Sequence, residues 1–339
     1  MKNSANVKNK VAGKIPVIFA LVGNSFITVI KFFGFMISGS GSMFSESIHS
    51  LADTANQGLL LIGIKRSTRK ADQDFSYGYG QERFLWALIS ACGIFFIGAG
   101  VTIYHGMSSL AHPEVVVISP IVFGILTVSF IIETITLLIA CKELFACKKK
   151  SFFWILKNGD PSTIAVFYED SVAVLGVAIA FFSILLTEKT GNYLWDALGS
   201  IVIGILLGIV AVVLINKNRK YLIKKSIPAE TKKRIIKIME SDPMIEKVLD
   251  FKSSVLDVGA YQIKCEVEFN GSALARKLYQ SDFIKEEYEI LKEDYSEFIR
   301  FLSEYADRVP RLIGREIDDI EDKIKKELPE IKHIDIEIN

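Results

Sequence analysis

The sequence is poor in the residues that build metal clusters and disulfide-rich domains. Of its 339 residues, only four are histidine and four are cysteine. The cysteines, Cys92, Cys141, Cys147 and Cys265, form no CxxC pair and no disulfide framework, so we predict neither disulfides nor a structural zinc finger. The formal charge is only +1, which gives no basis for nucleic-acid binding. No nucleophile–base pair and no phosphate-binding glycine loop is visible, so the sequence does not predict an enzyme.

Long apolar runs are what the sequence has in abundance. Hydrophobic residues make up 50% of the chain, and the mean hydropathy is +0.33. The first run is too long for the apolar core of a cleavable secretory signal, so no such signal is expected. Six runs reach the roughly 20 residues that a helix needs to cross a bilayer. They lie at Ile15–Ile37, Ser42–Ile64, Phe84–Ser108, Val115–Ala140, Thr163–Thr187 and Trp195–Ile215.

The distribution of basic residues predicts how the chain lies in the membrane. Lysine and arginine number four in residues 1–14 and five in each of 65–83, 142–162 and 216–225, whereas 38–41, 109–114 and 188–194 hold one in total. Basic residues accumulate in cytoplasmic loops. We therefore predict a multi-pass protein of a prokaryotic plasma membrane with both termini in the cytoplasm.

The second run, Ser42–Ile64, carries the residues on which the functional hypothesis depends. Glu46, His49, Asp53 and Asn56 interrupt it at offsets of three, seven and ten, which places all four on one face of a helix. Ionisable groups inside a membrane are costly and usually line an ion pathway. His49 and Asp53 stand one turn apart, a spacing that allows both to bind one metal ion. The pattern predicts a path for a divalent cation.

Three further charged residues lie in other apolar runs. Glu169 and Asp170 are adjacent in the fifth run, and their insertion cost favours a functional role. On a helix they diverge by 100°, so both face one cavity only if it is broad or the helix is distorted. Glu133 stands alone in the fourth run, where it either neighbours the site, relays protons or pairs with Lys31 of the first run.

Two features of the sixth run are expected to have a structural role and no direct role in transport. Gly204 and Gly208 form a GxxxG step, which allows close approach of another helix in lipid. Asp196 stands at the start of this run, where we expect it to cap the N-terminus of its own helix.

The periodicity changes after the sixth run and predicts a small α+β domain. The order α-β-β-α-β in about 115 residues gives two domains, 1–220 in the membrane and 221–339 in the cytoplasm. A charged stretch at about 272–305 is predicted to be a helical insertion, separated by Pro310 from the last helix. The expected elements are helices Ala229–Glu240 and Ile313–Leu328 and strands Met244–Ser253, Ala260–Phe269 and His333–Ile338.

This pattern resembles the cation diffusion facilitator family of divalent-metal transporters. The resemblance covers nearly the whole chain and includes six spans, the loop ADQDFSYGYGQER, an ExxHxxxD motif in the second span and a ferredoxin-like tail. Within that family, the chain is most similar to the zinc transporter 9 type, in the stretches SIHSLADTANQGLLL, EDSVAVLG and HIDIEI. The resemblance implies an α-helical membrane protein with six transmembrane helices and a cytoplasmic α+β ferredoxin-like domain that carries a helical insertion.

The resemblance also implies a ligand set. His49 and Asp53 match the two ligands of the family's second span, and Asp170 matches the aspartate of its fifth span. The family's usual histidine, one turn before that aspartate, is replaced by Val166, which cannot bind metal. Glu169 is the natural substitute, as the ED pair of the zinc transporter 9 type implies. Glu46, Asn56 and Glu133 are expected in the pathway or around the ligands.

Accessory metal sites found in some family members look absent from this sequence. In the loop after the second span, Phe75 and Tyr79 occupy positions usually held by histidine, and only Asp72 of that pattern remains. In the tail, Leu249 and Glu337 stand where other members have histidine. We therefore expect the tail to support dimerisation without binding metal.

The function implied is efflux of zinc from the cytoplasm by a homodimer that exchanges it for protons. One imidazole and three carboxylates suit tetrahedral Zn²⁺, although such an oxygen-rich set leaves Mn²⁺, Fe²⁺ and Co²⁺ open. Zinc is then the transported ion rather than a cofactor. A different class of function is also open: a metal-responsive membrane receptor that transports nothing, for which the insertion at 272–305 is the only argument.

Overall fold

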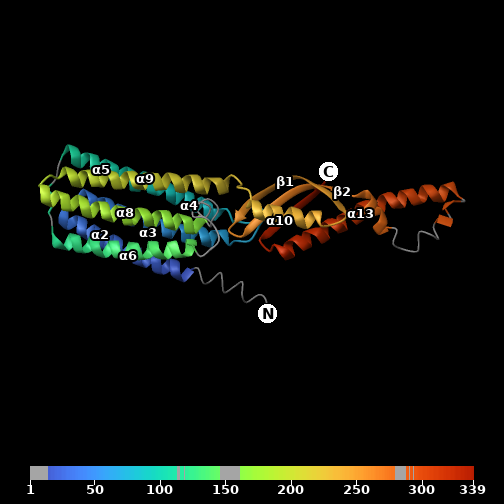
Figure 1. Ribbon diagram of the computed structural model, residues 1–339, viewed down its shortest axis with the longest axis horizontal. Helices are drawn as coiled ribbons and strands as arrows, with labels where there is room; N and C mark the ends of the chain where they lie inside the picture. The colour runs from blue at the N-terminus through green and yellow to red at the C-terminus, as the bar shows by residue number, and fades with distance from the viewer. Residues whose placement is uncertain are drawn as a thin grey trace. The chain divides into compact units, whose positions relative to one another are not determined.

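The chain forms two compact units, Met1–Ile223 and Lys224–Asn339, in a computed structural model (Figure 1). The residues that the structure describes are 14–112, 115–117, 119–145, 161–278, 288–289, 291–292 and 294–339. The first unit is helical, and the second combines helices with one sheet.

Long helices that run alongside one another make up the first unit (Figure 1). They are α2 (Lys14–Ser38), α3 (Gly41–Ser67), α4 (Glu82–Gly93), η1 (Ile94–Ala99), α5 (Gly100–Ala111), α6 (Pro120–Phe145), α8 (Pro161–Thr190) and α9 (Leu194–Leu222). The π-helical η1 joins α4 and α5 into one continuous rod. Within the described residues, five helices are long and apolar enough to cross a membrane: α2, the α4–η1–α5 rod, α6, α8 and α9. Helix α3 has 27 residues but is more polar.

The N-terminus of α3 is held by hydrogen bonds to an aspartate of α9. Ser40 caps it by accepting a hydrogen bond from the Met43 amide at 3.1 Å. The Asp196 carboxylate accepts from Ser40 Oγ at 2.6 Å and from the Gly41 amide at 2.5 Å. Together with the Ser42 amide, which donates to the same carboxylate at 3.2 Å, the Gly41 contact satisfies free N–H groups at the start of the helix. The prediction that Asp196 caps its own helix is therefore wrong, because it caps α3 instead.

The glycines of α9 allow the close packing that the GxxxG step predicts. A β-carbon added at Gly204 would lie 2.7 Å from Ile103 Cγ1 and 3.0 Å from Thr102 Cγ2 of α5. At Gly208 the nearest atom would be Ala99 Cβ, at 3.5 Å. Gly204 therefore lets α5 and α9 approach more closely than a larger residue would permit.

The second unit has the predicted order of elements. Its elements are α10 (Ala229–Glu240), β1 (Ile245–Asp257), β2 (Ala260–Phe269), α11 (Gly271–Leu278), α13 (Tyr295–Glu327) and β3 (Ile331–Ile338). The sheet order is β1-β2-β3, with β1 antiparallel and β3 parallel to the central β2. Alternate residues of β2, Ile263, Cys265 and Val267, are fully buried. They belong to one hydrophobic core with residues of α10 and α13, such as Ile235 and Ile324. This alternation is expected of a strand that packs one face against helices.

Helix α13 departs from the prediction at Pro310. The sequence predicts that this proline separates two helices, but α13 is one helix of 33 residues that includes Pro310. Proline removes one backbone hydrogen bond from a helix. Two i,i+4 ion pairs support the helix here: Arg308 with Glu304 before the proline, and Arg311 with Asp307 across it. Part of the predicted insertion, 279–287, lies outside the described residues.

Candidate functional site

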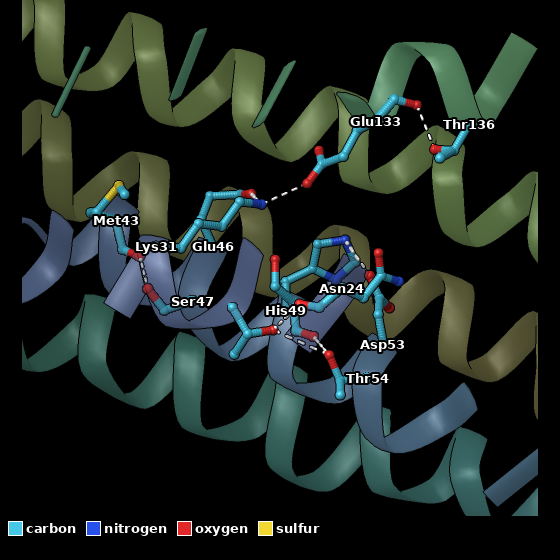
Figure 2. Close-up of polar contacts among 12 residues, drawn as sticks. Asn24, Lys31, Met43, Glu46, Ser47, His49, Asp53, Thr54, Glu133 and Thr136 are labelled. Atoms are coloured by element: carbon cyan, nitrogen blue, oxygen red, sulfur yellow. Dashed lines mark hydrogen bonds and ion pairs between the residues drawn. The ribbon is translucent and has the colours of Figure 1, made fainter. Parts of the chain in front are cut away.

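Helix α3 brings Glu46, His49, Asp53 and Asn56 onto one polar face, as their spacing predicts (Figure 2 labels the first three). Burial is uneven along this face. Glu46 is fully buried, and the His49 side chain is 3% exposed, whereas that of Asp53 is 19% exposed. Asn56, almost one turn further along, is buried again at 4% exposure, so Asp53 is the most exposed of the four.

His49 and Asp53 form the pair that their one-turn spacing predicts. His49 Nε2 lies 3.5 Å from Asp53 Oδ2. In the described part of the chain, neither ring nitrogen of His49 has a hydrogen-bond partner, although both are buried. A buried imidazole without such partners is uncommon, and both its nitrogen atoms could bind an incoming ion.

Helix α8 supplies the two carboxylates of the fifth predicted span. Glu169 Oε1 accepts a hydrogen bond from Asn56 Nδ2 at 2.8 Å. Asp170 Oδ2 is buried, and it has no hydrogen-bond partner among the residues that the structure describes. Asp53 interacts electrostatically with both Glu169 and Asp170, so acidic groups of α3 and α8 act on the same region.

The described residues do not, however, include any three His, Cys, Asp or Glu side chains grouped closely enough to hold a metal ion. The predicted four-ligand set is therefore not assembled in this arrangement. Simultaneous binding by His49, Asp53, Glu169 and Asp170 requires side chains or helices to move.

A buried ion triad lies beside the His49–Asp53 pair. Lys31 Nζ is 2.7 Å from Glu46 Oε2 and 2.7 Å from Glu133 Oε1 (Figure 2). Side-chain exposure is 0% for Lys31 and Glu46 and 11% for Glu133. Of the three roles left open for Glu133, the structure shows the pairing with Lys31. Lys31 of α2 is thereby joined to α3 and α6, and it balances one of the two negative charges of Glu46 and Glu133.

Gly176 of α8 leaves room for this triad and provides a test of it. A β-carbon at Gly176 would lie 2.3 Å from Glu46 Oε1. We therefore expect Gly176→Ala to displace the Glu46 carboxylate and lower the free energy of unfolding by about 1–3 kcal/mol. Denaturant unfolding of the full chain in detergent measures the change.

Gly124 of α6 provides the matched control, because a β-carbon added there would meet nothing within 4 Å. Gly124→Ala should leave stability unchanged or raise it by up to about 1 kcal/mol through helix propensity. Equal effects of the two substitutions would contradict close packing of Glu46 on Gly176.

Asp72, which remains from the family's accessory loop site, serves a structural role. Its carboxylate accepts hydrogen bonds from the Asp74 and Phe75 amides and from the Tyr79 hydroxyl, the last at 2.6 Å. The Tyr79 hydrogen bond is the main reason why the pKa of Asp72 is lowered. The Arg69 guanidinium lies over the Tyr79 ring at 4.2 Å. These contacts fix the loop that follows α3.

Sequence reasoning did not identify Ser90 of α4. Its hydroxyl donates to Asn56 Oδ1 at 2.6 Å, and the serine is 3% exposed. A single serine in an apolar run carries no periodic or charge signal, so only its contact with Asn56 identifies it. Ser90 precedes the π-helical η1 by four residues, and such turns often occur near functional sites.

Comparison with known proteins shows the family. Residues 17–223 match the model of the cation efflux transmembrane domain. The chain is 38% identical over 341 residues to the human protein named proton-coupled zinc antiporter SLC30A9, mitochondrial, covering 99% of this chain and 60% of that protein. It is 35% identical over 335 residues to metal tolerance protein C4 of Arabidopsis thaliana, covering 94% and 72%. A weaker match, 23% over 236 residues, is to the manganese efflux system protein MneP of Bacillus subtilis, covering 67% and 73%.

The chain therefore belongs to the cation efflux family, which confirms its resemblance to the cation diffusion facilitators. Its relatives are named as transporters, which confirms the prediction that it is not an enzyme. The chain spans about 60% of the length of the human relative.

The predicted location is wrong. Relatives matched over nearly the whole chain include proteins of human, mouse and Arabidopsis thaliana, and the two animal proteins are named mitochondrial. They point to a eukaryotic organellar membrane rather than a prokaryotic plasma membrane. The physical reason for the error is that a positive-inside bias orients helices in a bilayer but does not identify which bilayer it is.

Proposed function

We propose that the chain moves Zn²⁺ across a membrane in exchange for protons, by alternating access, with His49, Asp53, Glu169 and Asp170 as the metal ligands. The observation that carries the proposal is the His49–Asp53 pair on α3, in which Asp53 also interacts electrostatically with the two carboxylates of α8. The name of the human relative, matched over 99% of this chain, supports both zinc and proton coupling.

The chemistry of the proposed ligands supports exchange rather than permanent binding. Imidazole and carboxylate ligands hold Zn²⁺ with four-coordinate geometry, and each must be deprotonated to do so. Protons therefore compete with the metal for the same atoms. Because the site is dispersed in this arrangement, binding would draw α3 and α8 together, and protonation on the opposite side would release the ion.

The exposure of the α3 face favours one residue as the first to meet the metal. Asp53 is the most exposed of the four polar residues on this face, because Glu46, His49 and Asn56 are all buried. We propose that the ion reaches Asp53 first. The proposed direction of transport, away from the side of the basic loops, follows from the cation efflux family to which the chain belongs.

The proposal includes the architecture that a family member would need. We propose that α3 is the sixth span, since its polar face turns toward other helices instead of lipid. Residues 1–220 then form the transport domain, and 221–339 form a ferredoxin-like domain with its insertion near 272–305. This second domain is proposed to support a homodimer.

The proposed exchange predicts zinc flux that is driven by a pH difference. We expect the full chain, reconstituted in liposomes, to move Zn²⁺ when the two sides differ in pH and to stop when a protonophore removes the difference. Asp170→Ala should reduce flux to that of protein-free liposomes. Fluorescent zinc and manganese indicators inside the liposomes would measure both ions.

The same assay separates the alternatives. If the protein moves Mn²⁺ but not Zn²⁺, the proposed site stands and the proposed substrate is wrong. The name of the Bacillus subtilis relative favours this alternative. The oxygen-rich ligand set also permits Fe²⁺ or Co²⁺. Absence of flux with all four metals, in protein that remains folded, would contradict the proposal and favour a metal-responsive receptor.

A further inference from the structure

We propose that Asn56, held by Ser90, is a specificity-determining residue that restricts Glu169 to one metal-binding oxygen. This inference rests on the proposed function, because it takes Glu169 as a ligand. The three residues come from three helices: α4 carries Ser90, α3 carries Asn56 and α8 carries Glu169.

The hydrogen bonds define the direction of the Asn56 amide. The amide presents Nδ2 to Glu169 Oε1 at 2.8 Å, and a carboxylate that binds a metal is ionised and can only accept such a bond. Its Oδ1 then faces Ser90 Oγ at 2.6 Å, and the hydroxyl donates to it. Asn56 and Ser90 are 4% and 3% exposed, so neither amide nor hydroxyl has ready access to water as a substitute partner. The amide is thereby fixed in one orientation.

This arrangement has a consequence for the number of donors at the site. A carboxylate can bind a metal through one or both oxygens, but the hydrogen bond from Asn56 occupies one lone pair of Glu169 Oε1 and makes this oxygen the weaker metal donor of the two. The remaining oxygen can act as a single donor, as one nitrogen of a histidine would. Four ligands that each donate one atom suit tetrahedral Zn²⁺, whereas Mn²⁺ favours octahedral coordination by six oxygen atoms. The Ser90–Asn56 pair therefore favours zinc over manganese at a site with three carboxylates.

Asn56→Leu tests the inference because it keeps a similar volume and removes the amide. Partners of metal ligands typically contribute 10- to 100-fold to metal affinity. We expect Asn56→Leu in the full chain to weaken Zn²⁺ binding by about 10-fold or more, while Mn²⁺ binding is retained or strengthened. The ratio of the two dissociation constants, measured by calorimetry in detergent, is the readout. Ser90→Ala should shift it in the same direction.

A double-mutant cycle with Glu169→Ala separates positioning from a general structural effect. If Asn56 acts through Glu169, then Asn56→Leu should not change the ratio further in the Glu169→Ala background. Asn218→Leu is the matched control: Asn218 is also buried, and its amide donates to the Leu214 carbonyl of its own helix. We expect this control to leave the ratio unchanged.

The cycle also distinguishes failure of this inference from failure of the proposed function. If Glu169→Ala weakens Zn²⁺ binding but Asn56→Leu leaves the ratio unchanged, the ligand stands and the role of Asn56 is overturned. An equal shift from Asn56→Leu in both backgrounds would also overturn it, since the effect would bypass Glu169. If Glu169→Ala itself leaves Zn²⁺ affinity unchanged, the proposed ligand set is wrong, and the inference fails with it.

Discussion

Replacing His49 and Asp53 together by alanine should abolish metal movement by the full chain in liposomes. The two side chains provide the proposed imidazole and one of the three carboxylates, and they lie 3.5 Å apart on α3. Two carboxylates on α8 would remain, which is too few donors for a four-coordinate zinc site. Zinc-indicator fluorescence should fall to the rate of protein-free liposomes, and zinc binding in detergent should be lost in parallel.

Ser47→Ala serves as the control on the same helix. Ser47 is fully buried, and its hydroxyl donates to the Met43 carbonyl one turn earlier at 2.8 Å (Figure 2). Its removal should leave flux near that of the parent protein. Parental flux in the His49→Ala/Asp53→Ala variant would mean that the ion takes another path, and the proposed site would have to be abandoned.

Residues close in sequence were the predictable part of this site. His49 and Asp53 lie in one helix, so their relation follows from helical geometry alone. Apolar length similarly located the long helices, and period-two alternation located β2 at Ala260–Phe269. Local sequence patterns predict a structural relation correctly when all the residues involved lie in one helix or strand.

Contacts between helices were not predictable to the same degree. Lys31 and Glu133 are 102 residues apart, and the sequence allowed their pairing without selecting it. Asp196 was assigned to its own helix because local capping rules do not include a neighbouring helix start. Asn56 was placed on the right face of α3, but its partner Glu169 lies on α8. Helix rotation and packing decide such contacts, and no single segment encodes them.

Lys31→Met should produce the largest loss of stability of the substitutions considered. It leaves Glu46 and Glu133 buried without the ammonium group that lies 2.7 Å from each. Removing one member of a buried ion pair typically costs about 3–5 kcal/mol, since the remaining charge has lost its water as well as its partner. Unfolding of the full chain in detergent, followed by tryptophan fluorescence, should therefore show a clearly lower free energy of unfolding than the parent.

The triple variant Lys31→Met/Glu46→Gln/Glu133→Gln tests whether this loss comes from uncompensated charge. It removes all three charges while keeping similar volumes, and replacing a complete buried ion group by neutral residues is often tolerated. We expect it to recover much of the stability lost in Lys31→Met. If the triple variant is as unstable as Lys31→Met, then packing of the lysine stem explains the loss. If Lys31→Met is as stable as the parent, the acids do not depend on Lys31 and the triad does not hold α2, α3 and α6 together.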